Sequence, residues 1–209
     1  MTDFDRKKHW EKIYSRMAFE EVSWYQSIPH VSLELIEKYT SSGESAIIDI
    51  GGGESRIAEN LITNGYKNVS VLDISAEAIR KSRLNLGDKA DSITWIESDV
   101  CDFIQENSYD IWHDRAAFHF LTKDEDIKTY VRNLTISLKP GGIFIVGTFA
   151  SDGPEKCSGV EIRRYSPALL QQALGNTFEK LECHEHQHST PSGAVQNFIF
   201  CVFRKNLNK

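Results

Sequence analysis

The sequence lacks the features that would place it in a special class of protein. No apolar stretch among its 209 residues approaches the roughly 18–20 residues of a membrane-spanning helix. The first residues contain no apolar signal-peptide core, so we expect a cytoplasmic protein that does not contact a membrane. Basic residues are fewer than acidic ones, 24 against 30. The resulting net charge of −6 disfavours a dedicated nucleic-acid surface.

Cysteine is also scarce, and its spacing does not match a metal site. The four cysteines include no CxxC pair and are too widely spread for a zinc ribbon. We expect free thiols in a reducing compartment. The histidines of "CHEHQH" (183–188) alternate and share one face of a strand, but neighbours on such a face lie nearly 7 Å apart (about two residues of rise). We therefore expect a strand face and no metal.

From residue 45 the chain alternates between short apolar runs and longer segments with helical spacing. The runs predict buried strands at 45–50, 68–74, 92–98, 109–115 and 143–149. Ser75 is a predicted N-cap, and Thr122 with Glu125 predicts a capping box. Segments 178–188 and 195–203 flank a Pro/Gly loop and predict an antiparallel hairpin. This order predicts a three-layer α-β-α sandwich whose seven-stranded, mostly parallel sheet has a reversed C-terminal hairpin strand.

The segment "AIIDIGGGESRIAEN" (46–60) places three glycines between the first strand and the next helix. Such a turn is a ligand site in open α/β sheets. The chain has no P-loop string, and the nicotinamide pattern fails at its third position, which holds Arg56. Glu54 would repel a diphosphate but tolerates the ammonium and sulfonium of S-adenosylmethionine (SAM). Asp73, 22 residues beyond Gly51, predicts a ribose ligand. NAD, or a tight turn with a solvated Asp73, remains an alternative.

At this point the chain resembles class I SAM-dependent methyltransferases. The resemblance rests on "IIDIGGGES", "VLDIS", "ESDVCDF" and "LKPGGIFIV" and covers residues 46–147. Ser55 replaces the last glycine of the family motif. By resemblance, the methionine end of SAM lies near the acid and glycines of the first motif, the ribose near the acid of the second, and the adenine near the second and third. The implied cofactor residues are Asp49, Gly51, Gly52, Gly53, Asp73, Ile74, Asp99 and Val100.

Two weaker resemblances concern the acceptor. "YDIWHDRAAFHFL" resembles the thiopurine and thiol methyltransferase branch, whereas "HWEKIYSR" with "SWYQ" resembles small protein-lysine methyltransferases. Trp24 is an expected cofactor-binding residue of a lid that also includes Trp10, Tyr14 and Tyr25, with ordinary packing of an N-terminal helix as the alternative. We expect residues 1–40 to form this N-terminal helical and aromatic lid segment, and residues 41–209 to form the SAM-binding domain.

The residues after the fourth strand, His113, Asp114 and Arg115, are the expected catalytic group, with His113 also near the cofactor. His113 is the one whose ordinary pKa suits a base at neutral pH. The alternative is a structural Asp114–Arg115 ion pair beside a core histidine. In the long loop at 150–166, Arg163 and Arg164 are candidate contacts for an acidic substrate, with solvated charge as the alternative.

The expected function is methyl transfer from SAM, with S-adenosylhomocysteine (SAH) as product, to a small-molecule thiol, amine or oxygen nucleophile. The alternatives are a protein-lysine methyltransferase, an NAD-dependent oxidoreductase and a SAM-binding protein without turnover. The oligomeric state is left open.

Overall fold

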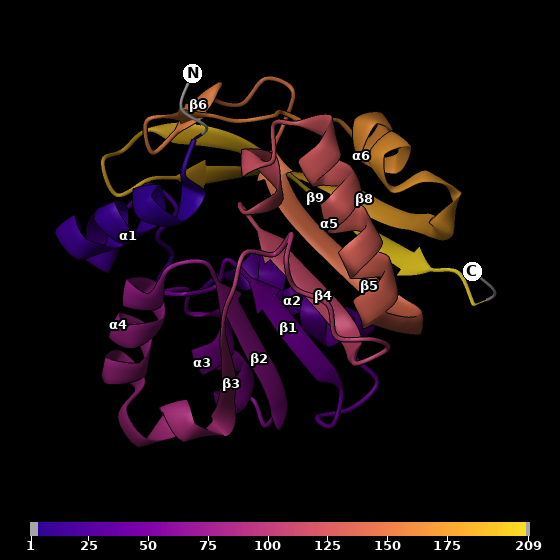
Figure 1. Cartoon of the computed structure of the whole chain (residues 1–209), viewed down its shortest axis with the longest axis horizontal. Coiled ribbons are helices and arrows are strands. Elements are labelled where there is room, and N and C mark those ends of the chain that lie inside the picture. The colour runs from indigo at the N-terminus through magenta and orange to yellow at the C-terminus, as the bar shows by residue number, and fades with distance from the viewer. Residues whose placement is uncertain (1–3, 208–209) are drawn as a thin grey trace.

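The computed structural model describes residues 4–207, and its central element is one seven-stranded sheet (Figure 1). The strand order is β3-β2-β1-β4-β5-β9-β8. All neighbours pair in parallel except β9, which is antiparallel to β5 and to β8. The predicted fold class is thereby confirmed. The strands are β1 (Ala46–Ile50), β2 (Asn68–Asp73), β3 (Ile93–Glu97), β4 (Tyr109–Arg115), β5 (Leu138–Phe149), β8 (Phe178–Ser189) and β9 (Val195–Lys205).

Helices cover both faces of this sheet, and each covering layer has its own apolar core. On one face, Tyr130 and Leu134 of α5 pack with Trp112 and Phe144 of the sheet. On the other, Ile36 of α2 packs with side chains that include Ile47. The helices are α1 (Arg6–Arg16), α2 (His30–Tyr39), α3 (Ile57–Thr63), α4 (Ala76–Leu86), α5 (Asp124–Ser137) and α6 (Pro167–Leu174), and short 3₁₀ turns lie at η1 (Phe19–Glu21), η2 (Gly87–Ser92), η3 (Phe118–Phe120) and η4 (Gly175–Thr177).

Local sequence signals explain where some of the helices begin. The side chain of Ser75 accepts a hydrogen bond from the Ala78 amide, as its predicted N-cap role requires. The Ser166 side chain caps α6 in the same way. The predicted capping box at Thr122 is wrong, because α5 starts one residue later than the box requires and its N-cap, Lys123, makes no side-chain capping bond.

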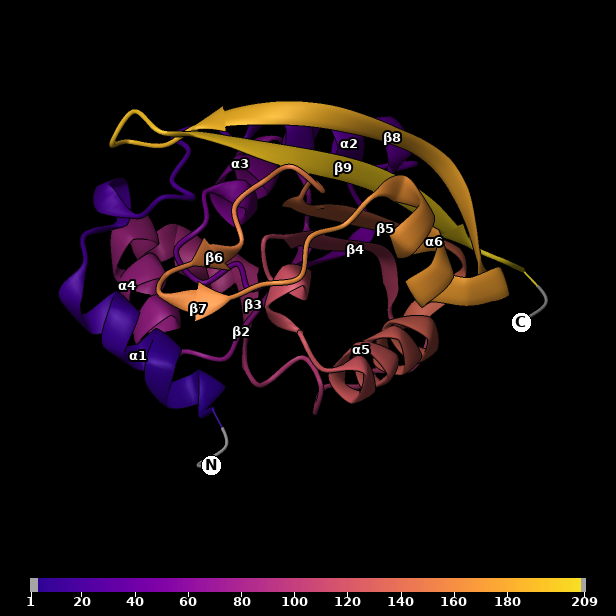
Figure 2. The same ribbon diagram turned by 90° about the horizontal axis from the view of Figure 1, so that it is seen from above.

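Helix α1 and a small hairpin lie over the carboxyl ends of the strands. Figure 2 shows α1 beside α4, with the hairpin of β6 (Lys156–Cys157) and β7 (Val160–Glu161) close to it. Helix α2, by contrast, is part of the main body, since its Ile36 is completely buried in the core. The expected division at residue 40 stays a prediction, and its residues 1–3, 208 and 209 lie outside the described part of the chain.

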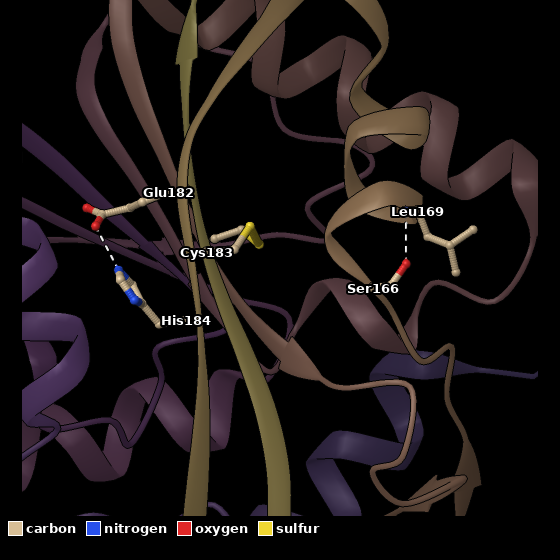
Figure 3. The surroundings of a disulfide bond; sticks show 6 residues. Ser166, Leu169, Glu182, Cys183 and His184 are labelled. Atoms are coloured by element: carbon tan, nitrogen blue, oxygen red, sulfur yellow. Dashed lines mark hydrogen bonds and ion pairs between the residues drawn. A yellow bond between two sulfur atoms is a disulfide. The ribbon is translucent and has the colours of Figure 1, made fainter.

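The β8–β9 hairpin holds a disulfide between Cys183 and Cys201, which face each other in the strand register (Figure 3). The expectation of four free thiols is therefore wrong for these two cysteines, because a separation of 18 residues gives no hint of their register. Cys101 and Cys157 are free.

Candidate functional site

A cavity lies at the carboxyl ends of β1, β2 and β4, where sequence analysis placed the ligand. Helix α1 and Trp24 close it from the outside. Its wall consists of Arg6, Trp10, Tyr14, Trp24, Ile50, Gly51, Leu72, Asp73, Ile74, Ser98, Asp99, Val100, Arg115, Ala116, Ala117, Phe120 and Leu121. Seven of the predicted site residues line this cavity. Six of them were expected to bind the cofactor, namely Trp24, Gly51, Asp73, Ile74, Asp99 and Val100, and the seventh, Arg115, was expected in the catalytic group.

The glycine turn after β1 contributes backbone to this cavity at one point. Gly51 lines it and has a φ of +64°, which L side chains rarely adopt. A Cβ on Gly53 would lie 2.7 Å from a carboxylate oxygen of Asp73, so the turn can hold this acid only with glycine there. Gly52 and Gly53 are buried behind the wall. Gly51 and Gly53 are therefore required by the geometry of the turn, and Gly51 also lines the cavity.

Asp73 is the acid that the wall presents at the end of β2. Its two oxygens accept hydrogen bonds from the amides of Gly53 (2.9 Å) and Ser75 (2.8 Å). Burial raises the pKa of Asp73 to about 6, and these two amide donors oppose that rise. A carboxylate has about four acceptor positions, so it can still accept two further hydroxyl groups.

Asp99 stands at the other end of the cavity, in the loop after β3. It accepts a hydrogen bond from the Cys101 amide and forms an ion pair with Arg6 of α1 (3.0 Å). Arg6 also pairs with Asp126 at the start of α5 (3.2 Å). No local pattern predicts that α1 reaches this acid, because the contact spans more than ninety residues.

His113 and Asp49 form a buried pair behind the cavity wall. His113 Nδ1 lies 2.7 Å from a carboxylate oxygen of Asp49, and its Nε2 lies 2.9 Å from the Ser32 hydroxyl. The other Asp49 oxygen accepts a hydrogen bond from Ser55 (2.7 Å). His113 is completely buried, and neither residue lines the cavity. Both ring nitrogens have partners within the fold, so the geometry does not support a direct proton transfer from an acceptor to His113.

Asp114 points away from the cavity into a different network. Its carboxylate accepts hydrogen bonds from the Tyr130 hydroxyl (2.7 Å) and from the amides of Ala117 and Phe118 (3.0 Å each). Burial raises the pKa of Asp114 to about 6, against the effect of these donors. No Asp114–Arg115 ion pair is present in the described part of the chain. Asp114 instead shapes the turn that places Arg115 and Ala117 in the wall.

Aromatic rings from three segments close the cavity. Trp10 makes edge contacts with Trp24 (5.9 Å between centroids) and Phe120 (4.8 Å), and Tyr14 contacts Trp24 at 6.3 Å. Tyr25 packs on Phe19 instead and does not line this cavity.

A groove beside the cavity shares part of the same wall. It is lined by Phe4, Arg6, Trp10, Phe120, Thr122, Val160 and Glu161. The loop at 150–166 therefore borders the site through β7. Arg163 and Arg164 of that loop pair with Asp124 (2.6 Å) and Glu155 (3.2 Å).

Glu54 and the histidines of β8, which were considered near a ligand or a metal, lie away from the cavity. Glu54 lines a separate groove with Phe19, and its pKa is raised by burial. Of the histidines on β8, His184 pairs with Glu182, whereas His188 Nε2 donates to the Ser23 carbonyl (Figure 3 for the former pair). Within residues 4–207, no group of three or more metal-ligating side chains lies close enough to hold an ion.

None of the helices in that range is long and apolar enough to cross a membrane.

Comparison with known proteins connects this geometry to methyl transfer. Residues 47–142 match the model of a methyltransferase domain. The EEF1A lysine methyltransferase 2 of Danio rerio is 24% identical over 157 residues, covering 67% of this chain and 66% of the relative. An N-terminal Xaa-Pro-Lys N-methyltransferase 1-B of Xenopus laevis is 25% identical over 178 residues, covering 80% and 76%. The chain spans only 18% of a mouse relative, the eEF1A lysine and N-terminal methyltransferase.

Solved structures share the fold over nearly the whole chain. A protein studied for the conversion of a disulfide bond into a thioacetal group during echinomycin biosynthesis superposes with a TM-score of 0.77 at 18% identity, covering 98% of this chain and 93% of that one. A SAM-dependent methyltransferase from Anabaena variabilis gives 0.76 at 14% identity, covering 98% and 96%. The N-methyltransferase NodS from Bradyrhizobium japonicum, in complex with SAH, gives 0.66 at 16% identity, covering 96% and 99%. The resemblance predicted from the sequence motifs is confirmed.

Proposed function

We propose, from the premise that this chain carries a class I SAM-dependent methyltransferase domain, that it transfers the methyl group of SAM to a small-molecule acceptor with a thiol, amine or oxygen nucleophile. The observation that supports this most is the cavity itself, which places Asp73, Asp99 and the Gly51 backbone along one wall at the carboxyl ends of the strands. Those are the positions at which open α/β sheets bind a nucleoside.

The residues present fit the parts of SAM. Asp73 has free acceptor positions for the two ribose hydroxyls, and Asp99 has one for an adenine amino group. Ile74, Val100 and Leu121 offer apolar surface for the adenine ring. Trp24 belongs to the aromatic cover. Asp49, Gly52, Gly53 and His113 act from behind the wall in this proposal, by holding the turn at Gly51.

When bound, the cofactor would supply a methyl group attached to a positively charged sulfur. The acceptor would take this methyl group by in-line displacement, and the sulfur would be left as a neutral thioether. The chain contributes orientation and exclusion of water, because Trp10, Tyr14, Trp24 and Phe120 close the cavity. Aromatic faces also stabilise a nearby cation.

The described wall contains no histidine, and burial raises the pKa of its Tyr14 well above the ordinary value. The site therefore favours an acceptor that needs little help to lose a proton. A thiol, with an ordinary pKa of about 8.5, is the nucleophile that needs least.

The neighbouring groove is the proposed path for the acceptor. It shares Arg6, Trp10 and Phe120 with the cavity and leads along the β6–β7 hairpin. A groove lined partly by aromatic side chains suits a small, partly apolar molecule.

A second candidate is methylation of a protein amine, either a lysine or an N-terminus. It is favoured by the curated relatives in zebrafish and frog, whose names state such substrates. An extended peptide would have to reach the cavity through the same groove.

One experiment separates the candidates. Purified protein is incubated with methyl-labelled SAM and a cell extract, and the products are fractionated by size, with Asp73→Asn as the inactive control. Label in the small-molecule fraction supports the first candidate, and label confined to protein supports the second. A parallel titration tests the premise, since binding of NAD without binding of SAH would contradict a methyltransferase.

A further inference from the structure

The groove beside the cavity is lined by three aromatic rings that solvent can reach. Phe4 is 55% exposed, and the half-buried rings of Trp10 and Phe120 meet edge to face with their centroids 4.8 Å apart. The face of an aromatic ring carries partial negative charge, so such rings attract a positively charged ligand as well as a flat apolar one. The charges around the rings decide between these two kinds of ligand.

Glu161 is a carboxylate of this groove that has no partner. It lies on β7, in the hairpin that Figure 2 shows close to α1. Its side chain is exposed and makes no hydrogen bond or ion pair within residues 4–207. Lys156 stands opposite it in the strand register without forming an ion pair, whereas Arg163 and Arg164 of the same loop are both paired. The carboxylate is therefore available to a ligand.

Arg6, the cation that lines the groove, is already neutralised by the fold. It pairs with Asp99 (3.0 Å) and with Asp126 (3.2 Å). One guanidinium and two carboxylates leave one negative charge, and Glu161 adds a second. A single free carboxylate among aromatic rings is a poor ligand set for a metal ion, which needs several oxygen, nitrogen or sulfur donors. The groove therefore attracts an organic cation and repels an anion.

We propose that Glu161 selects an acceptor that carries a positively charged nitrogen. This inference rests on the proposed function, because it takes the groove as the path of a small-molecule acceptor. The charged nitrogen lies between the Glu161 carboxylate and the rings of Phe4 and Trp10. The nucleophile, a separate atom of the same molecule, reaches the cavity along Phe120, which lines both spaces. Glu161 is then a specificity-determining residue and takes no part in the methyl transfer itself.

Two probes of the same shape test the preference for positive charge. Choline carries a quaternary nitrogen, and 3,3-dimethylbutan-1-ol carries a carbon atom in its place. Each is titrated into protein saturated with SAH, and binding is followed by tryptophan fluorescence, because Trp10 lines the groove. The wild-type protein should bind choline about 3–30-fold more tightly than the alcohol, the range expected for a cation–π contact together with a partly exposed ion pair.

Three variants assign this preference to its parts. Glu161→Gln keeps the shape of the side chain and removes its charge, so it should weaken choline binding about 2–5-fold and leave the affinity for the alcohol unchanged. Phe4→Leu should also weaken choline binding more than that of the alcohol, because it removes a ring and keeps apolar surface. Glu179→Gln is the matched control, since it removes the same charge from an exposed position on β8 outside the groove, and it should change neither affinity.

The acceptor itself gives an independent readout. Small-molecule products that carry label from SAM are passed over a cation exchanger at pH 7, and the proposal expects the exchanger to retain the label. Glu161→Gln should label the product more slowly than the wild type at low concentrations of extract and approach the wild-type rate at high concentrations. Such a difference in KM without one in kcat is expected of a residue that binds the acceptor away from the reacting atoms.

Each other outcome has a definite meaning. Equal affinities of the wild type for the two probes, including binding of neither, would overturn the proposal. A preference for choline that is unchanged in Glu161→Gln would overturn it as well, and so would small-molecule label that the cation exchanger does not retain. Failure of SAH to bind, or label confined to protein, would contradict the proposed function instead, whereas the comparison of the two probes reports on the groove in either case.

Discussion

At the residue scale, the acids and histidines of the site divide by what they face. Asp73 and Asp99 face the cavity, whereas Asp49 and Asp114 do not line it and accept hydrogen bonds from buried side chains of the fold. A side chain one position along a strand points to the opposite side of the sheet, which separates Asp114 from its two neighbours. Proximity in sequence to the reaction centre is therefore no guide to which of His113, Asp114 and Arg115 can contact a ligand.

The raised pKa of Asp73 gives a pH dependence of cofactor binding. The carboxylate form is the better acceptor for ribose hydroxyls, so SAH affinity should rise with pH through about 6 and level off above it. Each pH unit below that point should cost up to about tenfold. Calorimetric titration between pH 5 and pH 8 measures this. Asp73→Asn should bind SAH at least about tenfold more weakly at pH 8 and lose the dependence. A wild-type affinity that stays constant over this range, together with an unchanged affinity in Asp73→Asn, would exclude Asp73 as the ribose ligand.

The buried His113 gives a prediction about stability. Removal of its ring takes the hydrogen-bond partner from one oxygen of the Asp49 carboxylate and from the Ser32 hydroxyl, in a buried place. We expect His113→Ala to lower the free energy of unfolding by about 2–4 kcal/mol, measured by urea denaturation. His30→Ala, at the exposed start of α2, is the control. If turnover with saturating SAM falls while stability is unchanged, His113 is again a candidate for the base.

At the element scale, α1 is attached to the body by polar contacts at both of its ends and in the middle. Glu11 accepts hydrogen bonds from the Ala76 amide (2.7 Å), the Glu77 amide (3.3 Å) and the Ser75 hydroxyl (3.2 Å). A helix N-terminus favours such a carboxylate, so α1 supplies to α4 a partner that α4 lacks on its own. Lys81 of α4 in turn donates to the Met17 carbonyl at the end of α1.

Loss of the Glu11 contact should loosen α1 and open the cavity. Loss of a comparable capping contact costs about 0.5–2 kcal/mol. We therefore expect Glu11→Ala to speed SAH dissociation by about 2–30-fold, measured by stopped-flow fluorescence of the lid tryptophans. Glu34→Ala, exposed on α2, should leave the dissociation rate unchanged. An unchanged rate in Glu11→Ala would show that α1 does not limit release.

At the scale of the whole molecule, the last two strands in the sheet order lie far along the chain from the site, yet they complete the sheet. Strand β9 pairs with β5 along seven residues and with β8 over most of its length. The Cys183–Cys201 disulfide joins β8 to β9 from within that register (Figure 3). The disulfide should therefore affect global stability and leave the cavity unchanged.

Reduction provides the test of this whole-molecule effect. A disulfide that closes a loop of this length contributes about 3 kcal/mol, so a reductant should lower the thermal midpoint by several degrees and leave SAH affinity as it was. Titration of thiols in denatured protein should find two without reductant and four with it. The variant with both Cys183→Ala and Cys201→Ala should not respond to reductant. Four thiols without reductant would contradict the disulfide.

The class of fold and much of the cavity wall could be predicted from the sequence. Strand and helix periodicity are local properties, and the parallel topology then requires that the ends of β1, β2 and β3 lie side by side. Gly51, Asp73, Asp99 and Val100 could therefore be placed in one cavity from their positions after these strands. The aromatic residues Trp10, Tyr14 and Trp24 were also found, because helical spacing and ring clustering are visible in the chain.

The partners of the charged groups in residues 4–207 could be known only from the folded chain. The contacts of Arg6 with Asp99, of Glu11 with α4 and of His113 with Ser32 join segments that are distant in sequence, and no local pattern encodes them. The Cys183–Cys201 pairing and the start of α5 at Asp124 were mispredicted for the same reason, since strand register and the packing of a helix end depend on partners elsewhere. Burial then raised the pKa of Asp73, because desolvation depends on everything that surrounds a group and not on the residues beside it in the chain.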